Sequence, residues 1–153
     1  MNFACPLIVV EDITASRRFY EDIMGMAMTL DLGDNLSFGG KLAIQRNYTG
    51  LVGLPEMKIM HKPNDHELYF EEENFDVFEE MLLKHEEIEY LHRAKEYPWG
   101  QRVVRFYDPD GHIIEVGESM ESVFRRFHSQ GMSVEEVAER TMHPLEFVKM
   151  YIS

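Results

Sequence analysis

The sequence predicts an α+β fold made of two similar βαβββ modules followed by a C-terminal helical extension. Three observations predict this fold class. The first half of the chain reads as a strand, a helix and three short strands, the second half repeats that order, and the remainder has only helical periodicity. We expect modules at about residues 3–50 and 65–118, within a domain spanning residues 1–118, and the extension at residues 119–153.

The first module begins with the apolar run Pro6–Val10, which is typical of a buried strand. Asp12 can cap the helix that follows, and Gly25 suits the left-handed position that ends a helix. Glycine-containing turns then separate three strand-like segments. These segments are Thr29–Leu32, Asn35–Phe38 and Lys41–Gln45.

The second module repeats this order with a strand at Glu67–Glu71 and a helix that Asn74 can cap. The second copy is the longer one, and we place its extra residues in a loop at His92–Gln101. An Asp-Pro-Asp-Gly turn at Asp108–Gly111 joins the last two strands. The remaining strands are predicted at Ile88–Leu91, Arg102–Tyr107 and His112–Val116.

The extension is predicted to contain three helices. Gly131 ends the first, Ser133 and Glu136 form a capping box that opens the second, and Pro144 suits the first turn of the third. From Glu118 onward six glutamates face four basic residues, so the extension lacks the basic surface of a DNA-binding hairpin. We expect it to pack on the domain or on a partner chain, and its removal to expose an apolar face.

Composition restricts the class of protein. The 153 residues include 28 acidic and 15 basic side chains, and the net charge of −13 opposes binding to nucleic acid or anionic membranes. The apolar runs are too short for a membrane span, and the first one lacks the basic segment of a signal peptide. The single cysteine excludes an internal disulfide. We therefore expect a cytoplasmic protein.

Three stretches carry a recognisable pattern: Val9–Gly25, Glu67–Glu71, and Arg105–Val116 with its Asp-Pro-Asp-Gly turn. In their order and spacing they resemble the glyoxalase, bleomycin-resistance and extradiol-dioxygenase proteins, also called the vicinal oxygen chelate (VOC) superfamily, over roughly residues 3–118. The resemblance implies paired modules whose curled sheets form a cavity, a divalent metal in that cavity in the family's enzymes, and a homodimer.

The resemblance also implies positions for metal ligands. Glu67 and Glu115 fit two of them, projecting into the cavity from opposing sheets, and Cys5 fits a third. His66 is a rival for Glu67 if the strand register shifts by one residue. The fourth position falls on Ile44 or Gln45, which are not usual ligands. The two-histidine set of an extradiol dioxygenase is not visible, and the glyoxalase I quartet is incomplete.

Without a metal, two facing carboxylates would repel each other, so that one would stay protonated and Glu67 and Glu115 would form an acid/base pair. Alternatively, each carboxylate pairs with Arg102 or Arg105. We expect a small-molecule ligand to contact Tyr69, Trp99, Arg102 and Arg105, although Trp99 could instead pack against a neighbouring module or subunit.

Two functions remain open. The first is a glyoxalase-like lyase or isomerase acting on a small oxygenated molecule, with Glu67 and Glu115 catalytic or holding Zn, Ni, Mn or Fe together with Cys5. The second is a metal-free protein that binds or sequesters an antibiotic-like molecule, for which the acidic chain favours a cationic ligand.

Overall fold

The computed structural model describes residues 1–152, which form two compact units. The first comprises residues 1–65 and 107–112, and the second comprises residues 66–106 and the chain from residue 113 onward. Each unit contains a four-stranded mixed sheet with helices, and the C-terminal extension is helical. The predicted α+β fold class is therefore confirmed.

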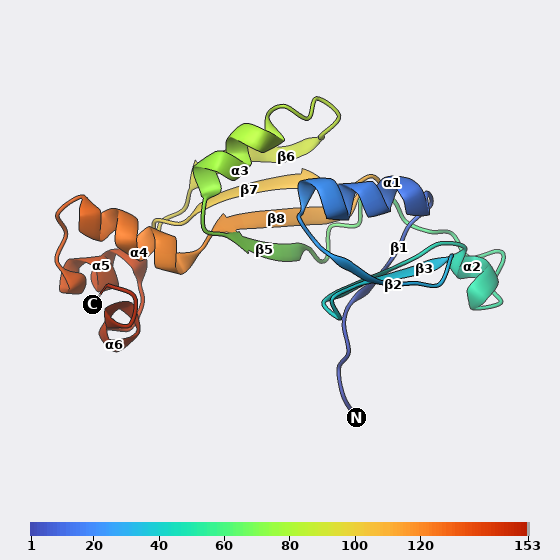
Figure 1. Cartoon of the computed structure of the whole chain (residues 1–153), viewed down its shortest axis with the longest axis horizontal. Coiled ribbons are helices and arrows are strands. Elements are labelled where there is room, and N and C mark those ends of the chain that lie inside the picture. Colours follow the sequence, from blue (N-terminus) through green and yellow to red (C-terminus); the bar gives the residue numbers. More distant parts are fainter. Residues whose placement is uncertain (153) are drawn as a thin grey trace. The chain divides into compact units, whose positions relative to one another are not determined.

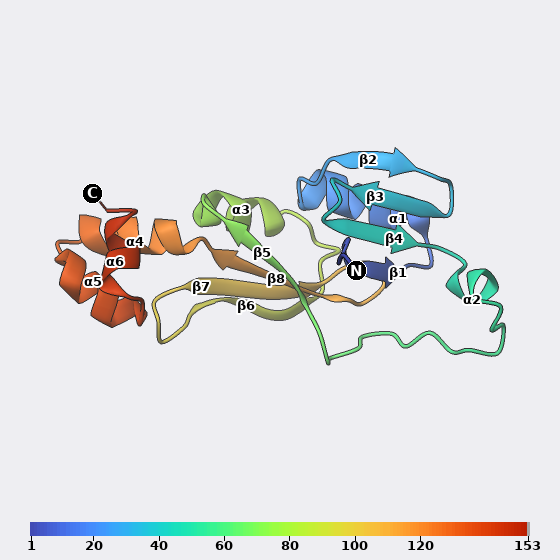
Figure 2. The ribbon, with the colours of Figure 1, turned by 90° about the horizontal axis from the view of Figure 1, so that it is seen from below.

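The sheet of the first unit has the strand order β1-β4-β3-β2 (Figure 2). The first strand pairs in parallel with β4, whereas the other pairs are antiparallel. The strands are β1 (Leu7–Val9), β2 (Met28–Asp31), β3 (Asn35–Phe38) and β4 (Leu42–Gln45), close to their predicted positions. A short helix that the sequence did not indicate, α2 (Tyr48–Leu51), follows β4.

Helix α1 (Ile13–Arg18) begins where the sequence predicts. The Asp12 carboxylate accepts hydrogen bonds from the backbone N–H groups of Thr14 at 2.9 Å and Ala15 at 3.1 Å. The helix continues as a π-helical turn, η1 (Phe19–Ile23). The buried ring of Tyr20 lies 5.7 Å, centroid to centroid, from that of Phe38 on β3, so this contact packs the helical segment against the sheet.

The Asp-Pro-Asp-Gly turn belongs to the first unit, although the strands that it joins lie in the second. The Asp110 carboxylate accepts hydrogen bonds from the backbone N–H of Glu11 at 2.7 Å and from the hydroxyl of Ser16 at 3.0 Å. The turn therefore supports the start of α1 as well as connecting two strands.

The sheet of the second unit repeats the same connectivity, with the order β5-β8-β7-β6. Helix α3 (Phe75–Leu82) lies over one of its faces (Figure 1). Its side chains Phe75 and Leu82 are buried. Asn74 precedes α3 but makes no capping hydrogen bond; instead its own N–H donates to the Glu72 carboxylate at 2.7 Å. The strands are β5 (Leu68–Glu72), β6 (Tyr90–Glu96), β7 (Arg102–Tyr107) and β8 (Ile113–Glu118).

The prediction of a loop at His92–Gln101 is wrong. Strand β6 continues through Glu96, and a turn at Tyr97–Gly100 follows. Part of the extra length of the second module therefore lies in its strands: β6 has seven residues against four in β2, and β7 has six against four in β3. Polar and charged side chains along this segment hid the strand pattern, because β6 is an edge strand on which such residues are tolerated.

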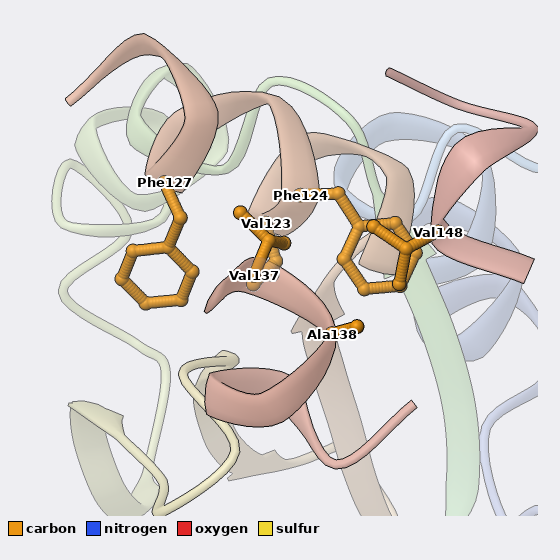
Figure 3. Close-up of a cluster of buried hydrophobic side chains, with 6 residues drawn as sticks. All are labelled: Val123, Phe124, Phe127, Val137, Ala138 and Val148. Atoms are coloured by element: carbon orange, nitrogen blue, oxygen red, sulfur yellow. The ribbon is translucent and has the colours of Figure 1, made fainter. Parts of the chain in front are cut away.

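The extension forms three helices with a core of their own (Figure 3). The predicted capping box is present: the Ser133 hydroxyl accepts from the N–H of Glu136 at 3.2 Å, and the Glu136 carboxylate accepts from the N–H of Ser133 at 2.7 Å. The helices are α4 (Met120–Ser129), α5 (Val134–Thr141) and α6 (Leu145–Lys149). Their shared core consists of Val123, Phe124, Phe127, Val137, Ala138 and Val148.

Among residues 1–152 no helix combines the length and the apolar character that crossing a membrane requires.

Candidate functional site

Polar side chains gather on the face of the second sheet opposite α3. Because side chains alternate along a strand, Arg105 on β7 and Glu115 on β8 point to this face, and Tyr69 on β5 is the strand partner of Glu115. Glu67, just before β5, and His92 on β6 complete the group through their contacts with Arg105. We call this surface the Arg105 face, defined by Glu67, Tyr69, His92, Arg105 and Glu115.

Arg105 uses its guanidinium to hold the centre of this face together. Its Nε donates to Glu67 Oε2 at 2.8 Å, and Nη2 forms an ion pair with Glu115. Its Nη1 donates to the hydroxyl of Tyr97 at 2.6 Å. Partial burial opposes the charged state, but the contacts with Glu67 and Tyr97 outweigh it and raise the pKa of Arg105 above its ordinary value. One arginine thus serves both candidate carboxylates.

The prediction that Glu67 and Glu115 project from opposing sheets is wrong. Glu67 lies immediately before β5, and Glu115 lies on β8, the parallel neighbour of β5 in the same sheet. The first and last strands of a βαβββ module pair with each other, which brings the two carboxylates together from one module. The positive charge of Arg105 lies between them and offsets their mutual repulsion.

His92 is a member of the face that the sequence did not reveal. Tyr90 pairs with Phe106 on the α3 side, whereas His92 pairs with Arg105, because the register shifts between these two positions of β6. Such a bulge changes which face a side chain occupies. His92 Nε2 lies 3.1 Å from Arg105 Nη1, and its Nδ1 lies 2.9 Å from the carbonyl oxygen of Arg93.

Arg102 is not brought to the Arg105 face. It lies three residues before Arg105, an odd separation that places it on the opposite side of the strand. There its Nε donates to Glu118 at 3.0 Å, and Nη1 forms an ion pair with Asp76 at the start of α3. The hydrogen bond that Arg102 donates to Glu118 outweighs partial burial and raises the pKa of Arg102 well above its ordinary value.

Aromatic side chains border the Arg105 face at the turn after β6. The rings of Tyr97 and Trp99 lie 4.9 Å apart, centroid to centroid. Trp99 Nε1 donates to Gln101 Oε1 at 2.9 Å, and Gln101 Nε2 donates to the hydroxyl of Tyr69 at 3.1 Å. Burial, opposed by Gln101 but assisted by a hydrogen bond to Glu71, raises the pKa of Tyr69. Tyr69 and Trp99, both predicted to contact a ligand, are thus joined by one polar chain.

These residues do not fit the expected divalent metal. Within residues 1–152 no three histidine, cysteine, aspartate or glutamate side chains are grouped as a metal site. A guanidinium already contacts both Glu67 and Glu115, and its charge would repel a cation placed between them. His66 is exposed beside Glu67, and Cys5 is half-buried before β1 in the first unit. Metal binding by Cys5 stays a prediction.

The first unit has a cleft of its own, of about 810 Å³, beside the ends of β1 and β4. Two of its charged groups are engaged within the unit: Arg46 forms an ion pair with Asp34, and Asp110 supports the start of α1. The Arg105 face is the stronger candidate because it combines several predicted site residues with an aromatic border.

Comparison with known proteins identifies the family. A family model described as a glyoxalase-like domain matches residues 3–121. The chain belongs to the glyoxalase-like family. The predicted superfamily is thereby confirmed. Most of the helical extension of this glyoxalase-like protein lies beyond the matched residues. No curated protein sequence matches the chain.

Solved structures agree with this assignment. A protein of unknown function from Agrobacterium tumefaciens str. C58 is 36% identical, with a TM-score of 0.68 over 78% of this chain and 94% of that one. A lactoylglutathione lyase from Agrobacterium tumefaciens is 23% identical, with a TM-score of 0.58 over 78% and 94%. A glyoxalase/bleomycin resistance protein/dioxygenase family enzyme from Burkholderia phytofirmans PsJN is 14% identical, with a TM-score of 0.63 over 75% and 96%. The last two show the fold alone.

Proposed function

We propose that this glyoxalase-like protein binds a small, planar, positively charged molecule on the Arg105 face without a metal ion, in the manner expected of a sequestration protein of the bleomycin-resistance type. The observation that carries the proposal is the bridge from Arg105 to both Glu67 and Glu115. It supports metal-free binding because the guanidinium occupies the carboxylate oxygens that a metal would need.

The face carries two carboxylates against one guanidinium, so its net charge favours a cationic ligand that lies over the face and not between the two carboxylates, where Arg105 already lies. The donors of Arg105 are already directed to Glu67, Glu115 and Tyr97, so they are not free to grip an anion. Glu67 is the more accessible of the two carboxylates, with 38% of its side chain exposed against 11% for Glu115, and it can accept from a ligand. The net charge of −13 would also draw cations toward the protein.

The aromatic border favours a planar ligand. Tyr97 and Trp99 present neighbouring rings, and Tyr69 is half exposed on the same face. A cation over an aromatic ring gains about 0.5–2 kcal/mol, depending on how far it is desolvated. The combination of rings with acceptor oxygens therefore suits a flat cation better than a small neutral polar molecule.

The alternative, a lyase or isomerase, would require Glu67 and Glu115 to be released from Arg105 before they could bind zinc, nickel, manganese or iron, or exchange a proton. Metal analysis of protein purified without chelator tests this alternative. A stoichiometric divalent metal that is lost in Glu115→Gln would support the enzyme and overturn the proposal.

Titration with proflavine, a planar cationic dye, tests binding directly through the anisotropy of the dye. We expect saturable binding that weakens about tenfold in Glu67→Gln, in line with the loss of one charge-assisted contact. Glu80→Gln, on the exposed surface of α3, makes the same charge change and is expected to bind like the wild type. Equal affinity in all three proteins, or stronger binding of the anionic dye anilinonaphthalene sulfonate, would overturn the proposal.

We also propose that the protein is a homodimer, which the family resemblance implies. Sedimentation velocity measures this directly: a single species at the monomer mass across the micromolar range would contradict it.

A further inference from the structure

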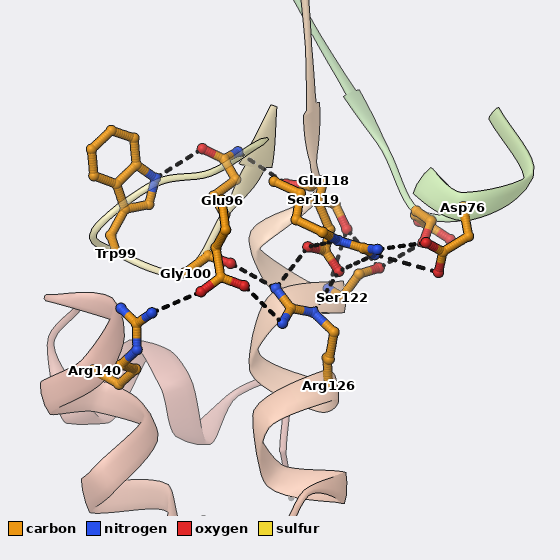
Figure 4. A network of polar contacts seen from close by, with 12 residues as sticks. Asp76, Glu96, Trp99, Gly100, Glu118, Ser119, Ser122, Arg126 and Arg140 are labelled. Carbon is orange, nitrogen blue, oxygen red and sulfur yellow. Dashed lines mark hydrogen bonds and ion pairs between the residues drawn. The ribbon is translucent and has the colours of Figure 1, made fainter. Parts of the chain in front are cut away.

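The helical extension contacts the turn that carries the aromatic border of the Arg105 face. Arg140 on α5 forms a hydrogen bond to the carbonyl of Pro98 and donates to Glu96 at 2.8 Å. Arg126 on α4 donates to the carbonyl of Gly100 at 2.6 Å and forms an ion pair with Glu96 at 3.3 Å. Two arginines of the extension therefore hold both ends of a four-residue turn (Figure 4).

An apolar contact reinforces these bonds. Gly100 adopts a φ of +83°, and a Cβ built there would lie 2.6 Å from Cζ of Phe127 on α4. The Arg126 and Arg140 guanidiniums lie over the Phe127 ring at 4.7 Å and 5.2 Å from its centroid. The turn thus rests directly on the aromatic ring, and only glycine permits this close approach at such a φ.

The Tyr97–Gly100 turn also positions side chains at the Arg105 face. The Tyr97 hydroxyl accepts from Arg105, and Trp99 is bound to Gln101, whose side chain reaches both Tyr69 and the carbonyl of Glu118 at the end of β8. A displacement of the turn would therefore move both aromatic rings and remove one of the hydrogen bonds that orient Arg105.

We propose that the C-terminal extension is a positioning element for the small-molecule site, in which Arg140 and Arg126, with Phe127 beneath Gly100, fix Tyr97 and Trp99 at the border of the Arg105 face. The extension lies almost wholly beyond the residues that the family model matches. The extension therefore adds to the family domain a segment that fixes the position of the aromatic border. The binding consequence rests on the proposed function, whereas the positioning itself does not.

The single tryptophan makes the positioning measurable without any ligand, because Trp99 alone gives the long-wavelength emission. We expect Arg140→Gln to increase quenching of this emission by acrylamide about twofold, since the turn loses two of its anchors and opens more often. Arg140→Lys, which can reach one acceptor but not both, should restore part of the protection. Arg125→Gln is the matched control, because Arg125 is 65% exposed and pairs with Glu121 on its own helix.

A second pair of variants tests the contact from the side of the turn. Gly100→Ala would place a methyl group against Phe127 and is expected to change Trp99 quenching in the same direction. Gly33→Ala is its control, since Gly33 has nearly the same φ, +81°, but no atom within 4 Å of the added Cβ. If Arg140→Gln and Gly100→Ala both leave quenching at the wild-type value while circular dichroism shows a folded chain, the positioning proposal is overturned.

The proflavine titration then separates the two proposals. If the wild type binds proflavine, Arg140→Gln should weaken binding several-fold and Arg125→Gln should not. Unchanged affinity in Arg140→Gln would refute the role of the extension in the site. If the wild type does not bind proflavine but the quenching results hold, the proposed function fails and the positioning role of the extension stands.

Discussion

The hydroxyl of Tyr20 donates a 2.7 Å hydrogen bond to the buried carboxylate of Asp108. The same carboxylate contacts the Nδ1 of His112 at 2.8 Å and accepts from the backbone N–H groups of Asp110 and His112. Burial, together with the charge of Asp108, raises the pKa of Tyr20 well above its ordinary value, so the tyrosine stays a donor. A fully buried carboxylate in the first unit is thus satisfied by four donors, one of which comes from the helical segment.

Tyr20→Phe should lower the free energy of unfolding by about 1–3 kcal/mol, because it withdraws a donor from a buried charge. Urea denaturation monitored by circular dichroism measures the loss. Tyr107→Phe is the control, since its partly exposed ring instead contacts the Lys62 ammonium at 4.8 Å. Equal stability of Tyr20→Phe and the wild type would show that Asp108 does not depend on this bond.

The His112 contact with Asp108 should make stability depend on pH near neutrality. Burial lowers the pKa of His112, but the hydrogen bond and charge of Asp108 prevail and raise it above its ordinary value of 6.5. A raised folded-state pKa gives stability that is fully present below pH 6.5 and is lost as the pH rises through the folded-state value. We therefore expect the free energy of unfolding to fall on going from slightly acidic to alkaline pH.

His112→Asn keeps a side-chain donor but cannot titrate, so its stability should change less across this range. Urea unfolding at a series of pH values measures the slope. His128→Asn, on an exposed position of α4, is expected to keep the wild-type slope. Parallel curves for His112→Asn and the wild type would contradict the prediction.

Local patterns predicted the elements wherever the chemistry is local. Asp12 and the Ser133–Glu136 pair cap their helices as their side chains require, and short apolar runs mark most strands. Strand β6 was shortened in the prediction because its polar edge residues do not alternate with apolar ones, and α2 was missed because four residues carry too little periodicity. Strand β6 is defined by its pairing with β7 and not by its own pattern, whereas α2 is too short to have a pattern.

Strand alternation accounts for part of the Arg105 face, but His92 and the contacts that join its members could not be predicted from the sequence. Glu67, Tyr69, Arg105 and Glu115 share a face because of strand alternation, which the sequence contains. A single guanidinium shared by two carboxylates depends on how three strands are ordered in the sheet. His92 lies on the Arg105 face because of a bulge in β6, and no residue of β6 indicates that bulge in the sequence.

Glu118 at the end of β8 is a second buried carboxylate that should make stability depend on pH. Its stabilising effect should be lost as the pH falls, whereas that of the His112–Asp108 contact is lost as the pH rises. Only 3% of its side chain is exposed, and it accepts from Arg102 and Arg126. Burial raises its pKa, but the two arginines prevail and lower it below the ordinary value of 4.5. Its contribution to stability is therefore present above pH 4.5 and is lost as the pH falls through the folded-state value.

Glu118→Gln should cost about 3–5 kcal/mol near neutral pH, because it leaves two partly buried guanidiniums without their shared charge. It should also flatten the acid limb of the stability curve relative to the wild type. Glu139→Gln, on an exposed position of α5, removes the same charge and should leave both quantities nearly unchanged. Thermal unfolding between pH 3 and 7 tests both expectations, and an acid limb as steep in Glu118→Gln as in the wild type would contradict them.

The three helices of the extension share one apolar core, and this core decides which truncation of the chain should expose apolar side chains. That removing residues 119–153 exposes an apolar face stays a prediction, but the buried cluster draws its members from the extension itself and would leave with it. Ending the chain at Gly131 is more informative, because it retains α4 with Val123, Phe124 and Phe127 and deletes the residues of α5 and α6 that cover them.

Exposed apolar area weakens folding by roughly 25 cal/mol per Å² and promotes association. We therefore expect the chain ending at residue 131 to bind anilinonaphthalene sulfonate and to self-associate in sedimentation more than the chain ending at residue 118. The reverse order, or a chain ending at residue 131 that matches the full-length protein in both measurements, would show that α5 and α6 do not protect α4.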